Sequence, residues 1–120
     1  MKQSKAIELY STDAERKLAK AVFRQIGNWQ DIWNCPENYR DASGGVNGFI
    51  YYNDTHRFTA NNIETILAVL SDWDEMTGQS TLAHAEQSDA FCGDWLNYLA
   101  WWSLETVIMG LMDLKEIENA

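Results

Sequence analysis

Two cysteines and two histidines are the residues of this chain whose types could support nucleophilic chemistry. Cys35 or Cys92 together with His56 or His84 would supply a thiol and a base, which a carboxylate could then orient. No nucleophile elbow accompanies them, and the glycine-rich stretch 43–48 lacks the Lys-Ser/Thr ending of a phosphate-binding loop. The residues therefore favour a protein that is not an enzyme, and the alternative is a small hydrolase or nucleotide-processing enzyme.

Metal-binding patterns are weak. The run Asp72-Trp73-Asp74-Glu75 resembles the start of a calcium loop but lacks the full set of spaced oxygen ligands and the glycine that such a loop needs. The two cysteines and two histidines have the right ligand types for zinc, yet their spacing matches no zinc motif. We therefore expect neither a metal nor another cofactor.

The start of the chain does not have the form of an export signal. Lys2 and Lys5 are not followed by an uninterrupted apolar run. The sequence contains no run of about 18 apolar residues, so we expect no membrane span. Two isolated cysteines are also fewer than a disulfide framework normally has. We expect a protein of the host cell cytoplasm with reduced thiols and no membrane contact.

Acidic residues outnumber basic ones by 18 to 9, which gives a formal net charge of −9. This balance argues against direct binding to nucleic acid, because such affinity comes from Lys and Arg. The excess is confined to residues 58–114, which contain no Lys or Arg. The acids of that stretch are Glu64, Asp72, Asp74, Glu75, Glu86, Asp89, Asp94, Glu105 and Asp113.

The concentration of negative charge in residues 58–114 has two interpretations. It can be a solvated face that aids solubility. It can also match a partner with a Lys/Arg-lined surface, since complementary potentials speed encounter. Such a partner would be a host protein whose basic surface binds nucleic acid, and the chain would act as a nucleic-acid mimic. The candidate partner-binding acids are Asp72, Asp74, Glu75, Glu86 and Asp89.

Six tryptophans are many for 120 residues. Large rings usually fill a core, but tryptophan is also enriched in the hot spots of protein interfaces. Trp101 and Trp102 point about 100° apart on a helix, so both can be buried only if that helix is enclosed. Tyr51, Tyr52 and Trp101 are the candidate aromatic anchors, either for a partner or for a homodimer.

Helical periodicity dominates the chain. Thr12-Asp13-Ala14-Glu15 has the form of a capping box and opens a predicted helix over 12–26. A second helix is capped by Asn61, carries Ile63, Ile66, Leu67, Leu70 and Trp73 on one face, and ends at Thr77-Gly78. A third runs from about 94 to 117 and is apolar nearly all round, which predicts the central element of the fold.

The stretches between these helices are harder to assign. Residues 28–48 look irregular apart from one helical turn around Trp29 and Trp33, and 80–86 could be a further short helix. The residues 48–52 favour a short extended segment. After it, either a hairpin returns through 57–59 or a short helix contains Phe58, and the helix is preferred. The sequence thus predicts one mainly α domain over 1–120, with three or four helices.

One stretch resembles a group of uncharacterised small proteins of phages and plasmids. These share a core of the form Gly-Gly-Phe-Ile-Tyr-Tyr-x-Asp-Thr, and here Gly44-Gly45 and 48–55 match it, with a departure at Val46-Asn47. The late segment 99–105, Leu-Ala-Trp-Trp-Ser-Leu-Glu, resembles the group's Leu-Ala-Trp-Phe-x-Leu-Glu. The resemblance covers about 43–107 and implies a mobile-element origin.

A fainter similarity points to plasmid anti-restriction proteins of the ArdB/KlcA type. It is confined to the segment Cys35, Glu37, Asn38 and Tyr39 followed by Gly44-Gly45. Together with the charge pattern, the resemblances imply an acidic inhibitor of a host defence system, of the anti-CRISPR or anti-restriction type. A structural or housekeeping phage protein that acts as a homodimer is a further alternative.

Overall fold

The computed structural model describes residues 1–40, 52–81 and 94–119, and every element within them is a helix. No strand occurs in these residues, which confirms the predicted mainly α fold. The elements are α1 (Gln3–Glu8), α2 (Asp13–Ile26), α3 (Trp29–Asn34), the 3-10 helix η1 (Pro36–Tyr39), α4 (Tyr52–Thr77) and α6 (Trp95–Asn119).

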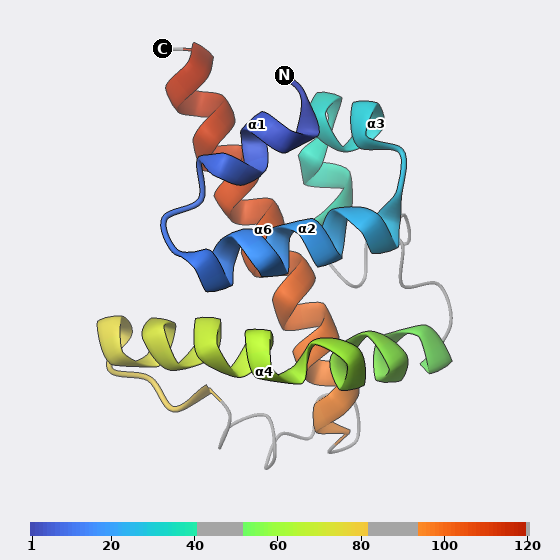
Figure 1. Cartoon of the computed structure of the whole chain (residues 1–120), viewed down its shortest axis with the longest axis vertical. Coiled ribbons are helices and arrows are strands. Elements are labelled where there is room, and N and C mark those ends of the chain that lie inside the picture. The colour runs from blue at the N-terminus through green and yellow to red at the C-terminus, as the bar shows by residue number, and fades with distance from the viewer. Residues whose placement is uncertain (41–51, 82–93, 120) are drawn as a thin grey trace.

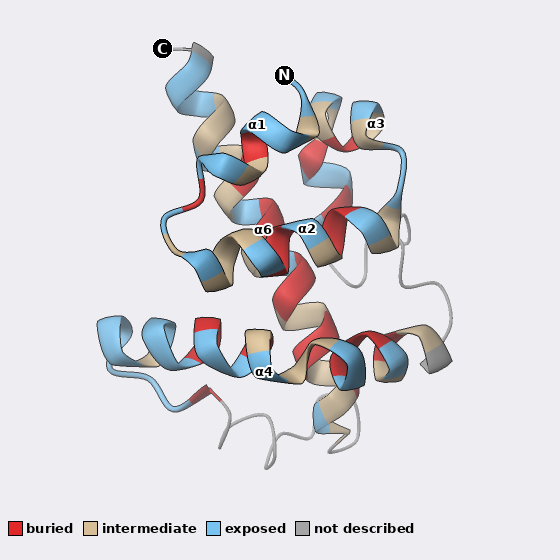
Figure 2. Ribbon diagram, in the orientation of Figure 1, coloured by how far each residue is buried: buried red, intermediate tan, exposed pale blue. Residues whose placement is uncertain are grey.

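Three long helices form the body of the molecule. Figure 1 shows α2 and α4 lying across the same side of α6, one above the other and running in opposite directions. Each of the three contacts the other two, while η1 packs on α6 and α1 packs on α2. Their shared interior is the core, in which the buried residues of Figure 2 concentrate.

The helix α2 forms as the sequence predicts. The Oγ1 atom of Thr12 accepts a hydrogen bond from the backbone N–H of Glu15 at 3.1 Å, which satisfies one of the free donors of the first turn. Leu18, Val22 and Phe23 are buried on the face turned to α4 and α6. The helix ends at Gly27, whose positive φ of 72° suits a residue without a side chain.

The helix α4 is longer than predicted and bends at Asn62. Residues 57–59 are helical, so the hairpin alternative is wrong and the helix containing Phe58 is confirmed. The helix start predicted at Asn61 coincides with a break one residue later, at Asn62 (φ −124°, ψ 17°), where two helical segments meet within α4. There the Nδ2 atom of Asn62 donates to the Phe58 carbonyl at 2.8 Å, an example of a side chain competing with the helical backbone.

The extended segment predicted for 48–52 falls almost entirely outside the described residues. Only Tyr52 lies inside them, and it is the first residue of α4 rather than part of an extended segment. The short helix predicted for 80–86 is described only at residues 80 and 81, so most of it also lies outside.

The helix α6 is central but not fully enclosed. Leu99, Leu104, Ile108 and Leu111 are essentially inaccessible to solvent and form the middle of the core. Trp101 and Trp102 are only half-buried, and Met109 on the same helix is 46% exposed. The prediction that α6 is surrounded is therefore correct for one side of the helix and wrong for the other.

Two contacts hold α6 in place, one at its start and one near its middle. At its start, Asp94 accepts a hydrogen bond from the N–H of Asn97 at 3.2 Å and pairs with Nε2 of His56 on α4 at 2.6 Å. Further along, the buried hydroxyl of Tyr10 donates to the carbonyl of Val107 at 2.6 Å. Tyr10 follows α1, so this bond ties the N-terminal segment to the central helix.

Candidate functional site

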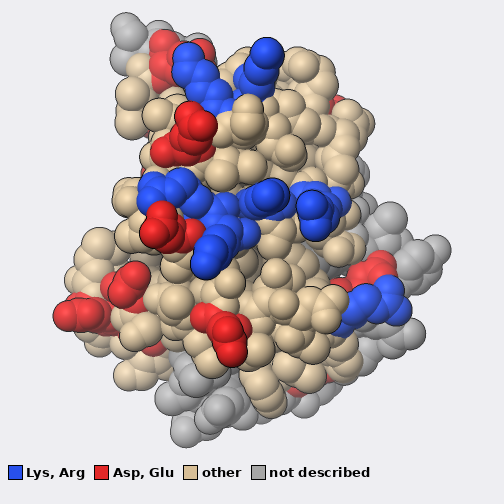
Figure 3. Space-filling model, viewed as in Figure 1, with Lys and Arg blue, Asp and Glu red and all other residues tan. Residues whose placement is uncertain are grey.

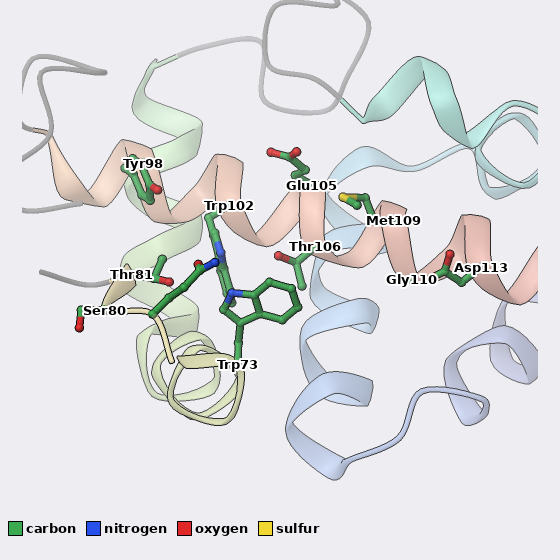
Figure 4. Close-up of a pocket in the computed structure, with 11 residues that line it drawn as sticks. Trp73, Ser80, Thr81, Tyr98, Trp102, Glu105, Thr106, Met109, Gly110 and Asp113 are labelled. Atoms are coloured by element: carbon green, nitrogen blue, oxygen red, sulfur yellow. The ribbon is translucent and has the colours of Figure 1, made fainter. Parts of the chain in front are cut away.

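One hollow of the described structure lies between Trp73 in the C-terminal half of α4, the residues after that helix, and α6. It has a volume of about 850 Å³. Figure 4 shows Trp73 of α4 and Trp102 of α6 approaching each other in it, with Thr106 beside them. Tyr98 and Met109 extend the lining along α6. The walls are thus mainly aromatic and apolar.

A second hollow of about 480 Å³ is also lined by Trp73 and reaches the start of α2. Tyr10, Leu18, Val69 and Met76 supply its apolar lining. Trp73, Thr106 and Gly110 line both hollows. Trp73 therefore borders both hollows, which share the stretch of α6 around Thr106 and Gly110.

Large apolar side chains are accessible beside these hollows. Trp73 is 38% exposed, Met109 46% and Met76 74%. Single exposed apolar residues are common on proteins, but these line the same pair of depressions. The arrangement is that of a surface able to receive apolar groups from another molecule.

Carboxylates from three helices surround the hollows. Glu15 of α2 and Asp72 of α4 line the smaller one, and Glu105 and Asp113 of α6 line the larger one. No Lys or Arg is among the described residues that line either hollow. A cationic group that enters would therefore meet only negative formal charges from this lining.

Two tyrosines beside the hollows have raised pKa values, for which burial is the largest cause and nearby carboxylates are the next. Burial, followed by the charges of Glu105 and Asp74, raises the pKa of Tyr98 above its usual value. Burial, followed by the charges of Glu15 and Asp113, raises the pKa of Tyr10. In both cases nearby carboxylates disfavour a further negative charge, which is the counterpart of attraction for a cation.

The basic residues lie mainly elsewhere. Arg16, Lys17, Lys20 and Arg24 are on α2, and Figure 3 shows Lys and Arg gathered in a band at that height of the molecule. Lys115 is the one Lys or Arg of α6, and its Nζ donates to the Asn34 carbonyl at 3.2 Å while lying over the ring of Trp33. The separation of charge along the sequence thus persists in space.

The predicted acids do not all have the same position. Asp72 and Glu75 are exposed on the last turns of α4. Asp74 is half-buried and accepts hydrogen bonds from both the backbone N–H (2.9 Å) and the Oγ1 (2.5 Å) of Thr81, so it also holds the chain after α4. Glu86 and Asp89 lie outside the described residues.

Among the predicted aromatic anchors, only Trp101 has a described side chain, and it is less exposed than Trp73 and Met109. Trp101 is half-buried and packs against the core. Tyr51 lies outside the described residues, and the side chain of Tyr52 is not described. Trp73 was instead assigned to the apolar face of its helix. Its position between Asp72 and Asp74 was the available signal that it lies at the edge of the core.

Candidate catalytic residues are only partly described. His56 and Asp94 form a base–carboxylate pair, but Cys92 and His84 lie outside the described residues. Cys35 is a free thiol where α3 meets η1, rather than on α4 or α6. Within the described ranges, no three His, Cys, Asp or Glu residues gather in a way that could hold a metal ion.

Comparisons with known proteins place the chain in a family. No curated protein and no solved structure matches it. Among the helices of the described residues, none combines the length and apolar character needed to cross a bilayer. Residues 8–119 match the family described as "Domain of unknown function (DUF7222)". Because this match spans nearly the whole chain, the protein belongs to the DUF7222 family.

Proposed function

We propose that this protein is a non-enzymatic inhibitor that binds a basic, nucleic-acid-binding surface of a host protein. The observation that carries the proposal is the pair of apolar hollows whose described lining contains four carboxylates and no Lys or Arg. Apolar groups surrounded by unneutralised acids combine contact area with charge selectivity, which are the two requirements of a specific protein interface.

The distribution of charge supports a partner that is itself basic. The last turns of α4 present Asp72 and Glu75 to solvent, beside the exposed Trp73 and Met76. Surfaces that bind nucleic acid carry clustered Lys and Arg and bind anions at a strength that falls with salt. A rigid helical face of spaced carboxylates would compete for such a surface.

The resemblance of 43–107 to small phage and plasmid proteins supports the biological setting. In that setting the partner is a component of a host defence system, and the inhibitor acts in the host cell cytoplasm. Such an inhibitor works by occupancy, so it acts at a one-to-one ratio and needs no cofactor.

One observation favours a second candidate, a small hydrolase. The Nε2 atom of His56 and the Oδ2 atom of Asp94 lie 2.6 Å apart. A histidine that is oriented by a carboxylate is the base of many nucleophilic sites. The same pair also joins the starts of α4 and α6, which is a sufficient structural reason for it. A hydrolase would turn over many substrate molecules per chain, whereas the inhibitor would not.

The test is a titration against the partner captured from host lysate. The inhibitor is added to a fixed amount of partner in the presence of labelled nucleic acid, and displacement of the nucleic acid is followed. We expect displacement to be complete near one inhibitor per partner. Displacement that continues catalytically at low ratios, or a ternary complex with no displacement, would contradict the proposal.

A further inference from the structure

We propose that the two hollows beside Trp73 form one continuous groove for a basic amphipathic helix of the partner protein. This inference rests on the proposed function and gives it a binding site and a chemical class of ligand. The proposed ligand carries apolar side chains on one face and Lys or Arg on the flanks of that face.

The first argument is the geometry of the groove. The hollows share Trp73, Thr106 and Gly110, so they adjoin each other, and the α6 residues of the smaller hollow lie within the stretch 98–113 that borders the larger one. Figure 4 shows Thr106, Met109, Gly110 and Asp113 following one another along α6 beyond the tryptophan pair. Residues at offsets of three and four lie on one face of a helix, so this face of α6 forms a long wall.

The second argument is the chemistry of the lining. Met76 and Met109 are flexible and polarizable, and exposed methionines adapt to apolar side chains of different shapes. Trp73 and Trp102 add large rigid surfaces. Such a lining can receive two or more anchor side chains from one ligand.

The third argument is charge complementarity. Glu15 and Asp72 line one hollow, and Glu105 and Asp113 line the other. An amphipathic helix that inserts its apolar face into the groove places its flanking Lys or Arg side chains near the carboxylates that line the two hollows. A ligand with acidic flanks would be repelled by the same groups.

The fourth argument concerns the ligand's backbone. Most of the described groove walls belong to helices, whose interior amides and carbonyls are already hydrogen-bonded to each other, and the other lining residues, at 10–12 and 79–80, belong to no strand. They offer no strand edge to which an extended peptide could add. A ligand whose own backbone is satisfied, as in a helix, therefore fits this groove better than an extended one.

The probe is a synthetic 18-residue peptide of Leu and Lys with apolar residues at helical spacing and blocked ends. One control peptide has Glu in place of each Lys. A second has the same composition with Leu and Lys alternating, which cannot form one apolar helical face. None contains tryptophan, so binding is followed through the protein's own tryptophan fluorescence, with helix formation followed by circular dichroism.

The protein offers a matched control for the central residue. Trp73→Ala removes the tryptophan that lines both hollows, whereas Trp95→Ala removes a tryptophan of equal exposure, 38%, that lines neither hollow. We expect Trp73→Ala to weaken binding of the helical peptide about tenfold, as for an interface anchor, and Trp95→Ala to leave it within about twofold. The peptide should gain helix on binding to the wild type.

A second variant keeps the inference testable if Trp73→Ala does not fold. Met76 and Met109 are exposed enough for the pair Met76→Ala/Met109→Ala to be expected to keep the fold, and it should also weaken binding. Equal binding to all variants would show attraction by surface charge alone and overturn the inference. Tight binding of the alternating or the acidic peptide would also overturn it.

The following outcomes distinguish a failure of the groove inference from a failure of the proposed function. A wild-type dimer that dissociates in Trp73→Ala would assign the groove to a second copy and overturn the inference. If partner capture depends on Asp72 and Glu75 but not on Trp73, the groove is wrong and the inhibitor proposal stands. If the peptide binds as expected but capture of the partner is unchanged when Asp72 and Glu75 are substituted, the inhibitor proposal fails.

Discussion

Asp74 has a structural role, whereas its neighbours Asp72 and Glu75 on α4 are the acids proposed to bind a partner. Its carboxylate accepts two hydrogen bonds from Thr81, one from the backbone N–H and one from Oγ1, and Thr81 is only 7% exposed. The change Asp74→Ala removes both acceptors and leaves the amide of a buried residue without this partner. Hydrogen bonds to a charged group contribute roughly 1.5–3 kcal/mol, so we expect a loss of about 2 kcal/mol in the free energy of unfolding.

The neighbouring acids provide the comparison. Asp72→Ala and Glu75→Ala change exposed side chains for which the described structure shows no hydrogen bond, so each should alter stability by no more than about 0.5 kcal/mol. Asp74→Asn keeps one acceptor oxygen and should fall between these values. Urea unfolding followed by circular dichroism measures all four proteins on one scale.

A double-mutant cycle makes the assignment specific. Thr81→Val removes the hydroxyl partner, so part of the cost of Asp74→Ala should vanish in the Thr81→Val background. The reasoning is refuted if Asp74→Ala costs no more than Asp72→Ala, or if its cost is unchanged by Thr81→Val. Binding experiments on the acidic face should for this reason substitute Asp72 and Glu75 and leave Asp74 intact.

Three further predictions concern the N-terminal segment and its contact with α6. Tyr10→Phe removes the buried hydroxyl that donates to Val107 and should cost about 1 kcal/mol in urea unfolding, with the helical content unchanged. A methyl group at Gly110 would lie 2.9 Å from Cε1 of Tyr10, so Gly110→Ala should destabilise the wild type by about 1 kcal/mol but stabilise a Tyr10→Ala protein, because alanine is the better helix former. The hydrogen bond to Asp31 raises the pKa of Tyr39 to about 12, above the ordinary value of 10.0, so stability should be full below pH 10 and fall as the pH rises toward 12, and Tyr39→Phe should reduce this fall.

The long helices were predictable because local signals and core packing agree in them. Thr12 caps α2 and Gly27 ends it, and the apolar spacing through Leu18 and Val22 matches the buried face. The helix start predicted at Asn61-Asn62 coincides with the break at Asn62, but the segment before it is also helical, so the two together form the longer helix α4.

The remaining differences come from contacts between distant parts of the chain. The helix α1 has no side-chain cap, and no local pattern in residues 3–8 predicts it. It is held by the burial of Ala6 and by the Tyr10 bond to α6, 97 positions away. Such contacts leave no local pattern in a sequence.

The candidate site was predictable in charge but not in shape. The acidic stretch was visible in the sequence, and Asp72 and Glu75 are exposed as expected. The apolar part was missed, because helical periodicity places Trp73 on the same face as Ile66 and Leu70. Those two are buried, while Trp73 lies at the edge of the α2–α4–α6 contact and is 38% exposed. Helical periodicity shows which face of a helix is apolar, but not how far along that face the neighbouring helices cover it.

The measurement that tests the central claim most directly is the affinity for the captured partner at about 50 and about 500 mM salt. It compares the wild type with Asp72→Asn/Glu75→Gln and with a control that neutralises two exposed acids elsewhere, Glu8→Gln/Glu37→Gln. We expect affinity to fall steeply with salt, mainly through slower association, and the first variant but not the control to weaken binding at low salt. An affinity that changes neither with salt nor with the loss of Asp72 and Glu75 would contradict the claim that this acidic face binds a basic partner.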